Sequence, residues 1–258
     1  MIDEGRSQVP ALDRAVKILS LISSKRSCSI QDLLQGTGIS RTTLYALLGA
    51  LAKAGFIRKR GDGRYMLWTA LAILGAQARE NIDLKGIAIP FLEDLVRSSG
   101  CLSCYLGVMD GTRAYFAVKA SNPNGAIMAK SDEGMDVDLV HSGMGKCLLA
   151  FCDADLRERL LPTLDYARIT RSSVPDQREL RAQLEAFRKQ GYAYNDSEDD
   201  EEIRSLAVPV FTSKGALIGA VSAVGTVNHV TDKKIGELVP LMRKAALGIG
   251  LAIEPFLK

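Results

Sequence analysis

Residues 29–67 read SIQDLLQGTGISRTTLYALLGALAKAGFIRKRGDGRYML, and this stretch decides the fold of the N-terminal part of the chain. Two runs with apolar residues at helical spacing are followed by two short strand-like runs. We expect Gly36 and Gly38 to break the first helix and Gly55 to end the second. The strand-like runs flank the GDG at 61–63, which is a strong signal for a hairpin turn. The stretch therefore predicts helix, turn, helix and hairpin in that order.

The residues around the two helices complete a DNA-binding arrangement. Residues 11–22 (ALDRAVKILSLI) predict a further amphipathic helix upstream. Ser29 and Ser40 are suited to cap the two short helices, and Ile39 is suited to anchor the turn between them. One face of the second helix is apolar and is made of Leu44, Leu47, Leu48 and Leu51. Together these features predict a winged helix-turn-helix that binds double-stranded DNA.

Several side chains of this motif are suited to contact DNA. A major groove admits one α-helix, whose hydrogen-bond donors must lie opposite its packing face. With the leucines buried, the start of the second helix presents Arg41 to a guanine edge or a phosphate. The basic hairpin suits phosphate contacts, although any single charge there could equally be a solvated strand end. The predicted DNA-binding residues are Lys25, Arg26, Ser40, Arg41, Thr42, Thr43, Tyr45, Arg58, Lys59, Arg60 and Arg64.

The distribution of charge supports this prediction. The net charge of the 258 residues is only +3. Residues 1–66, however, contain eleven lysines and arginines against five acidic residues, whereas the rest of the chain contains 22 basic and 25 acidic residues. A basic head on a mildly acidic body indicates a polyanionic partner at one end only.

Cysteine usage and hydropathy indicate a compartment. The five cysteines are odd in number and scattered, which is typical of free thiols in a reducing environment. The N-terminus lacks the pattern of a signal peptide, and no apolar run reaches the roughly 18 residues that a membrane-spanning helix needs. We therefore expect a cytoplasmic protein with no membrane partner.

The remainder of the chain predicts an α+β fold with an antiparallel sheet, because strands alternate with helices. The helical pattern from 68 to 98 is interrupted around 81–86 and again at Pro90. Expected strands are 101–109, 112–119, 204–212, 216–225 and an additional one at 126–130; expected helices are 142–151, 153–160, 176–190 and 232–256. The expected domains are a winged helix-turn-helix over 1–68, a linker helix over 69–82 and a second domain over 83–258.

The GMGK at 143–146 is reminiscent of a phosphate-binding loop, but the chain does not complete that motif. The motif needs glycine at position 140 and serine or threonine at 147, where this chain has Val140 and Cys147. We instead expect Lys146 to pair with a nearby carboxylate or with a helix end.

Two further patterns have simple structural interpretations. Cys101 and Cys104 have the spacing of half a metal site, but no second cysteine or histidine pair accompanies them. On a strand they would point to opposite faces, so we expect core thiols. The acidic run DSEDDEE at 196–202 fits a solvated loop better than a cation site. We expect no metal, no cofactor and no catalytic residue.

Four stretches give the chain a specific resemblance. These are residues 11–22, the stretch 29–67, HSGMGKCLLAF at 141–151 and GYAYNDSEDDEEIRSLAVPVFTSKGALIGAVSAVG at 191–225. They resemble the isocitrate-lyase-regulator (IclR) family of bacterial transcription factors. The resemblance implies a winged helix-turn-helix joined by a linker helix to a GAF-like effector-binding domain. It also implies a homodimer or homotetramer, and effectors that are small carboxylates or aromatic acids.

The resemblance also implies an effector pocket in the second domain. The backbone N–H groups of Gly143 and Met144 would bind a carboxylate, as helix N-termini can. Asn195 would lie at the pocket rim, and Ser205 and Ser222 would supply hydroxyl groups. Val224 stands where related members can have a second serine. The apolar Ile127 and Met128 favour a larger, partly apolar ligand.

The most direct functional hypothesis is a DNA-binding regulator whose operator binding responds to a small-molecule effector. Two other classes stay open at this point. One is an enzyme that uses a DNA-binding head for localisation, which turnover of a bound acid would reveal. The other is a DNA-binding assembly protein without an effector, whose second domain would have a filled core.

Overall fold

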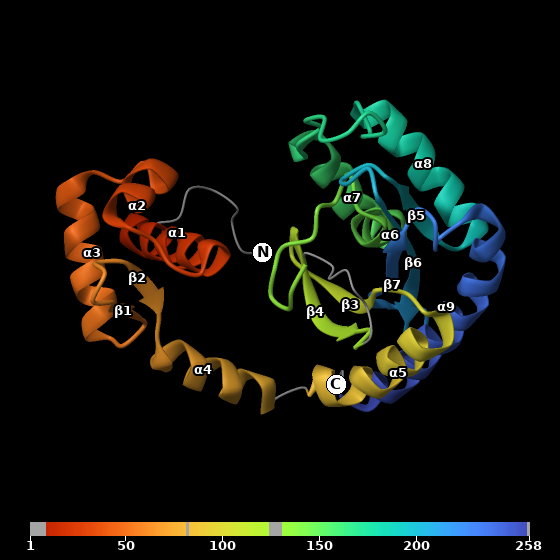
Figure 1. Ribbon diagram of the computed structural model, residues 1–258, viewed down its shortest axis with the longest axis horizontal. Helices are drawn as coiled ribbons and strands as arrows, with labels where there is room; N and C mark the ends of the chain where they lie inside the picture. The colour runs from red at the N-terminus through yellow and green to blue at the C-terminus, as the bar shows by residue number, and fades with distance from the viewer. Residues whose placement is uncertain (1–8, 81–82, 124–130, 257–258) are drawn as a thin grey trace. The chain divides into compact units, whose positions relative to one another are not determined.

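The computed structural model describes residues 9–80, 83–123 and 131–256. The chain forms two compact units, Met1–Ile82 and Asp83–Lys258 (Figure 1). The expected strand at 126–130, with Ile127 and Met128, lies outside the described residues.

The N-terminal unit has the predicted helix, helix, turn, helix and hairpin order. Apolar faces of the three short helices and of the hairpin enclose one small core, in which Ile18, Leu33 and Leu44 are fully buried. The two strands pair antiparallel, with Ile57 opposite Leu67. The elements are α1 (Pro10–Lys25), α2 (Ile30–Thr37), α3 (Arg41–Lys53), β1 (Ile57–Lys59), β2 (Tyr65–Leu67) and α4 (Thr69–Glu80).

The helix boundaries in this unit match the predictions in part. Ser29 forms a reciprocal capping box with Asp32 at the start of α2, as predicted for Ser29, and Gly38 ends α2 in the left-handed conformation. Gly36 does not break α2 but lies within it, where a Cβ would press on Leu21 of α1. Ser40 occupies the N-cap position of α3, as predicted, but its hydroxyl donates to the Thr43 hydroxyl and caps no backbone N–H.

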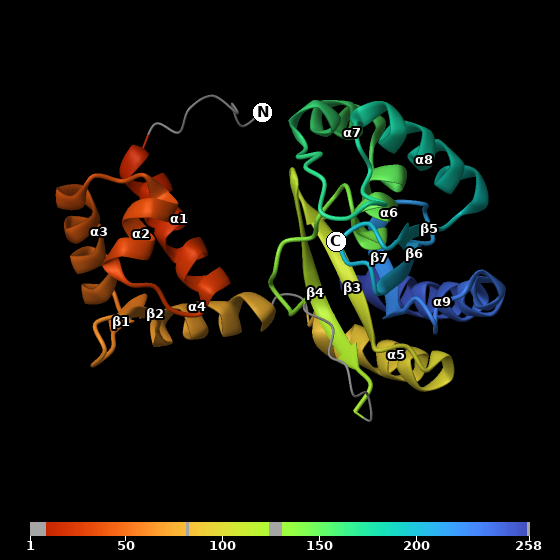
Figure 2. The same ribbon diagram turned by 45° about the horizontal axis from the view of Figure 1, so that its top comes forward.

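A five-stranded antiparallel sheet organises the C-terminal unit, with strand order β4-β3-β7-β6-β5. Helices α5 and α9 cover one face, and α6 to α8 cover the other (Figure 2). The strands are β3 (Ser103–Asp110), β4 (Arg113–Ser121), β5 (Ala193–Asp196), β6 (Ile203–Phe211) and β7 (Leu217–Thr226). The helices are α5 (Leu84–Ser99), α6 (Gly143–Phe151), α7 (Ala154–Leu160), α8 (Gln177–Gln190) and α9 (Asp232–Ile253), with short 3-10 turns at Leu161–Thr163 and Glu254–Phe256.

Three expectations for this unit need correction. Helix α5 continues through Pro90, because its apolar face packs on the sheet and outweighs the backbone hydrogen bond that a proline cannot make. Strand β5 was not predicted, although its residues alternate between buried and exposed. Cys101 precedes β3 while Cys104 lies within it, so both thiols enter the same core rather than opposite faces. All five cysteines are free, as expected.

Candidate functional site

Helix α3 presents a polar surface opposite its packing face. Leu44 and Leu48 are buried, whereas Arg41 and Thr42 are exposed and Tyr45 is 48% exposed. Thr43 is half-buried and accepts a hydrogen bond of 2.9 Å from the Ser40 hydroxyl. The start of α3 thus offers a guanidinium, hydroxyl groups and a phenol on one side, as a recognition helix requires.

The β1–β2 hairpin carries exposed basic side chains. The guanidinium of Arg58 lies 4.5 Å from the centre of the Trp68 ring, and the ammonium of Lys59 lies 5.9 Å from that of Tyr65. Arg60 forms a loose ion pair of 3.5 Å with Asp62 at the turn. Both partners of that pair are about half exposed, so the pair adds little energy and leaves Arg60 able to reach a phosphate.

The other predicted basic residues divide into two kinds. Lys25 and Arg26 are exposed at the end of α1. Arg64 instead donates to the hydroxyl and the carbonyl of Ser27, at 3.1 and 2.8 Å, and to Asp32 at 3.3 Å. The guanidinium of Arg64 therefore ties the hairpin to the start of α2. Nothing in the local sequence distinguishes it from the exposed Arg58 or Lys59.

A cavity of about 380 Å³ opens in the C-terminal unit beside β3, β6 and β7. Its walls combine two aromatic rings, apolar side chains, hydroxyl groups and carboxylates. The lining residues are Tyr105, Phe116, Ser131, Asp136, Asp138, Ser142, Met144, Asp199, Asp200, Glu202, Ile203, Ser205, Ser222 and Val224. The volume is in the range of pockets that hold small organic molecules.

The cavity brings together three of the five predicted effector-binding residues. Met144, Ser205 and Ser222 line it, and the Ser222 hydroxyl makes no hydrogen bond to any described residue. The backbone N–H of Gly143 is directed at Ser205, to whose hydroxyl it donates at 3.3 Å. Asn195 lies behind the lining, where its amide group donates to Asp199 and accepts from the backbone N–H of Glu198.

Most of the acidic run at 196–202 is solvent-exposed, as expected, but the run also contributes to the cavity and to the core. Asp199, Asp200 and Glu202 line the cavity, whereas Glu198 is buried in the protein. Asp136 and Asp138 also line the cavity, and no motif had singled them out. Loop carboxylates acquire such positions only from the fold, since their spacing along the chain follows no periodic pattern.

Behind the cavity, α6 contributes a buried charge. Lys146 is fully buried, and its ammonium donates to Glu198 at 2.5 Å and to Gln183 at 3.1 Å, which confirms the prediction of a carboxylate partner. Burial lowers the pKa of Lys146 and raises that of Glu198, while the attraction between the two charges opposes both shifts. The cavity is therefore backed by an ion pair between α6 and the acidic loop.

A histidine just before α6 contacts Asp138, one of the residues that line the cavity. His141 is buried, and its Nδ1 lies 3.1 Å from Asp138 Oδ2. The same carboxylate accepts the backbone N–H groups of Val140 and His141 through Oδ1. Asp138 is thus held in place at the entry to α6.

Family models match both units of the chain. The IclR helix-turn-helix domain matches residues 11–61, and the C-terminal domain of the bacterial transcriptional regulator IclR matches residues 76–251. The chain belongs to the IclR family of bacterial transcriptional regulators. IclR-family proteins combine a DNA-binding helix-turn-helix with a C-terminal effector-binding domain, and the two units have these roles.

Relatives of this IclR-family protein are regulators rather than enzymes. It is 35% identical to the uncharacterized HTH-type transcriptional regulator RhmR of Escherichia coli K12 over 227 residues, covering 88% of this chain and 86% of RhmR. A solved IclR transcriptional regulator from Alicyclobacillus acidocaldarius has the same fold, with a TM-score of 0.80, 23% identity, and coverage of 95% and 98% of the two chains.

A third related structure contains a small molecule. It is an IclR homologue from Microbacterium hydrocarbonoxydans complexed with 4-hydroxybenzoate, with a TM-score of 0.78, 22% identity, and coverage of 95% and 99% of the two chains. In the IclR-family protein described here, no helix within the described ranges has the length and apolarity to cross a membrane.

Proposed function

We propose that this IclR-family protein is a cytoplasmic homodimer or homotetramer that binds a pseudo-palindromic operator and responds to a small carboxylate or aromatic acid. Residues 1–68 would read DNA, residues 69–82 would link the domains, and residues 83–258 would bind the effector and assemble the oligomer. The effector would alter operator affinity by binding one arrangement of the DNA heads better than another.

The observation that supports DNA reading is the exposed polar face of α3 next to the basic hairpin. In a dimer, two such helices would enter major grooves about one helical turn apart, or a multiple of that distance. Arg41, Thr42 and Tyr45 lie where base edges and phosphates would be reached. Arg58 to Arg60 would contact the backbone, which contributes salt-dependent affinity.

The observation that supports an effector is the cavity, where the Ser222 hydroxyl makes no hydrogen bond to any described residue. Tyr105 and Phe116 supply ring faces against which an aromatic or aliphatic body could pack. The hydroxyl groups of Ser205 and Ser222 supply donors. The relative that binds 4-hydroxybenzoate makes aromatic acids a reasonable first set of compounds.

The test is binding of the purified protein to its own upstream intergenic DNA, titrated with salt and with a panel of carboxylates that includes 4-hydroxybenzoate. We expect specific, salt-sensitive binding that one compound shifts. Specific binding that no compound alters would contradict the effector and favour an assembly role for the C-terminal unit. If upstream DNA is not bound, selection of operators from the whole genome decides whether any specific site exists.

A further inference from the structure

The cavity proposed to bind the effector has an acidic entrance. Among the described residues that line it there is no lysine, arginine or histidine. Tyr105, Met144 and Ser222 are buried and form its inner end. The carboxylates lie on the solvent side, since all but one of them belong to exposed residues. We call these five carboxylates the acidic rim: Asp136, Asp138, Asp199, Asp200 and Glu202.

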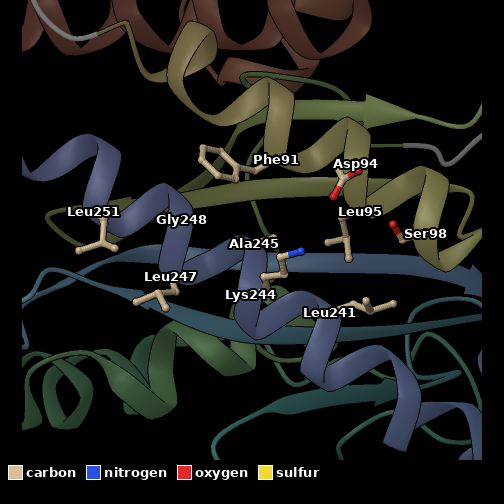
Figure 3. A pocket seen from close by; sticks show the side chains of 10 residues that line it. All are labelled: Phe91, Asp94, Leu95, Ser98, Leu241, Lys244, Ala245, Leu247, Gly248 and Leu251. Carbon is tan, nitrogen blue, oxygen red and sulfur yellow. The ribbon is translucent and has the colours of Figure 1, made fainter.

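The acidic rim is not a general property of the C-terminal unit. On the other face of the sheet, a groove of about 290 Å³ between α5 and α9 is lined by both Asp94 and Lys244 (Figure 3). The chain after residue 66 contains 22 basic residues against 25 acidic ones. Five carboxylates around one cavity, with no cation among its described lining residues, depart from this balance.

Cations of the protein neutralise only part of the acidic rim. Arg113 donates to Asp136 at 2.8 Å, in a pair whose side chains are both exposed. Asp199 accepts the amide of Asn195 and forms no ion pair with a described residue. The Glu202 carboxylate makes no ion pair or hydrogen bond to any described residue. A cleft lined by one sign of charge concentrates ions of the opposite sign, so the rim favours a cationic group of a ligand.

The inner end of the cavity points to a bound ligand independently of these charges. Ser222 lines the cavity and is 1% exposed, and its hydroxyl makes no hydrogen bond to any described residue. Buried polar groups are normally hydrogen-bonded, so a polar group of a ligand is the natural partner of this hydroxyl. Met144, in the first turn of the nine-residue helix α6, borders the same end. The N-terminus of a helix favours an anionic group.

The two ends of the cavity match a ligand that carries both charges. Its carboxylate would lie near the first turn of α6 and the Ser222 hydroxyl, and its ammonium group would lie at the acidic rim. A ligand with a carboxylate alone would be repelled by the rim and would gain nothing from it. We infer that the effector is an amino acid, whose protonated amine accompanies the carboxylate. The inference rests on the proposed function and narrows its class of small acids.

The rest of the cavity favours an apolar or aromatic side chain on this amino acid. The rings of Tyr105 and Phe116 are packed with their centres 4.9 Å apart, and both residues line the cavity. Val224 lines it as well. Ring faces and aliphatic groups bind apolar bodies, whereas the hydroxyl groups and carboxylates orient them.

The experiment titrates the full chain with the protein amino acids in a calorimeter. Each amino acid that binds is compared with the acid that lacks its amine: phenylalanine with hydrocinnamate, and leucine with isocaproate. We expect an amino acid to bind at least about tenfold more tightly than its amine-free acid, because the ammonium group gains charge-assisted hydrogen bonds. Equal or tighter binding of the amine-free acids would overturn the inference, and so would the absence of binding by any amino acid.

Charge variants test the acidic rim directly. Glu202→Gln should weaken binding of the amino acid about three- to tenfold, and it should not weaken binding of the amine-free acid, which loses a repulsion. Asp94→Asn is the control, because it removes the same charge from an exposed site in the groove of Figure 3, and it should change neither affinity. Equal effects of Glu202→Gln on the two ligands would contradict an ammonium group at the rim.

Operator binding separates this inference from the proposed function. An amino acid that binds the protein and shifts its operator affinity supports both. If an acid without an amine shifts operator affinity and no amino acid does, the inference about the acidic rim fails while the proposed function stands.

Discussion

Lys146 Nζ lies 2.5 Å from Glu198 Oε1 inside the C-terminal unit, although 52 residues separate them in the sequence. Lys146 is fully buried and the Glu198 side chain is 5% exposed. The stabilising effect of such a pair shows when one partner is removed, because the remaining charge is then buried without compensation. It fixes the start of the acidic loop against α6, and the following residues of that loop line the cavity.

Removing one charge of this pair should be strongly destabilising. Lys146→Met or Glu198→Gln leaves a buried group without its partner, at a cost of about 3–5 kcal/mol in the free energy of unfolding. The double variant Lys146→Met with Glu198→Leu should recover much of that loss. Denaturant titration measures all three, and Arg181→Met, which breaks the exposed Arg181–Glu158 pair, serves as the control with a much smaller effect.

A single variant with near wild-type stability would contradict the burial of this pair.

Gly145 should tolerate no side chain. A Cβ there would overlap the backbone of Asp138 and Leu139, which cannot move aside as a side chain can. We expect Gly145→Ala to cost about 2–3 kcal/mol of unfolding free energy. Gly236 in α9 has open space around it, so Gly236→Ala should stabilise by about 0.5–1 kcal/mol. If Gly145→Ala and Gly236→Ala changed the free energy of unfolding equally, in thermal or chemical unfolding, the close approach at Gly145 would be refuted.

The N-terminal unit should lose stability in acid through Asp32. Hydrogen bonds from the backbone and the hydroxyl of Ser29, and then attraction to Arg64, lower the pKa of Asp32. The unfolded chain therefore takes up this proton at higher pH than the folded one. The stabilisation is complete above the ordinary pKa near 4 and is lost as pH falls through the lower folded value.

The measurement uses the single tryptophan of the chain, Trp68, as a reporter of this unit. Melting followed by its fluorescence should give a higher midpoint for the wild type than for Asp32→Asn at pH 6. The difference should shrink toward pH 3. A difference that does not depend on pH would show that the carboxylate charge plays no part.

Arg41 and Arg60 should contribute differently to DNA binding. If Arg41 contacts a base edge, Arg41→Ala should weaken operator binding about ten- to hundredfold and affect random DNA much less. Arg60→Ala should weaken binding to both and reduce the slope of log affinity against log salt by about one. Fluorescence anisotropy with operator and scrambled duplexes over a salt series distinguishes these effects. Equal losses for both variants on both duplexes would refute this division.

Ser222 should matter for the effector and little for the fold. Its hydroxyl makes no hydrogen bond to described residues, so Ser222→Ala should leave unfolding and ligand-free operator binding unchanged. Affinity for the compound that shifts operator binding should fall about two- to tenfold, the value of one hydrogen bond. Ser103→Ala is the control, because Ser103 is equally buried but lies outside the cavity lining. Calorimetry that finds no difference between the two variants would place the ligand elsewhere.

The N-terminal unit could be predicted almost completely because its signals are local. The Ser29 capping box, the left-handed Gly38 and the leucine face of α3 each depend on residues within a few positions of one another. The exposed basic hairpin follows from the same short-range pattern. The roles of Gly36 and Arg64 could not be predicted, since each depends on contact with another element of the unit.

For the C-terminal site, local sequence patterns predict the elements but not the roles of the acidic residues. The sequence by itself determined the antiparallel hairpins, the helix that starts at Gly143 and the serines of β6 and β7. Only the tertiary structure decided that Glu198 is buried while its neighbours Asp199 and Asp200 line a cavity. Adjacent carboxylates have the same chemistry and no periodic spacing, so their roles depend on which of them meets Lys146 across the fold. Long-range contacts of that kind determine burial, and burial determines which charge is structural and which faces a cavity.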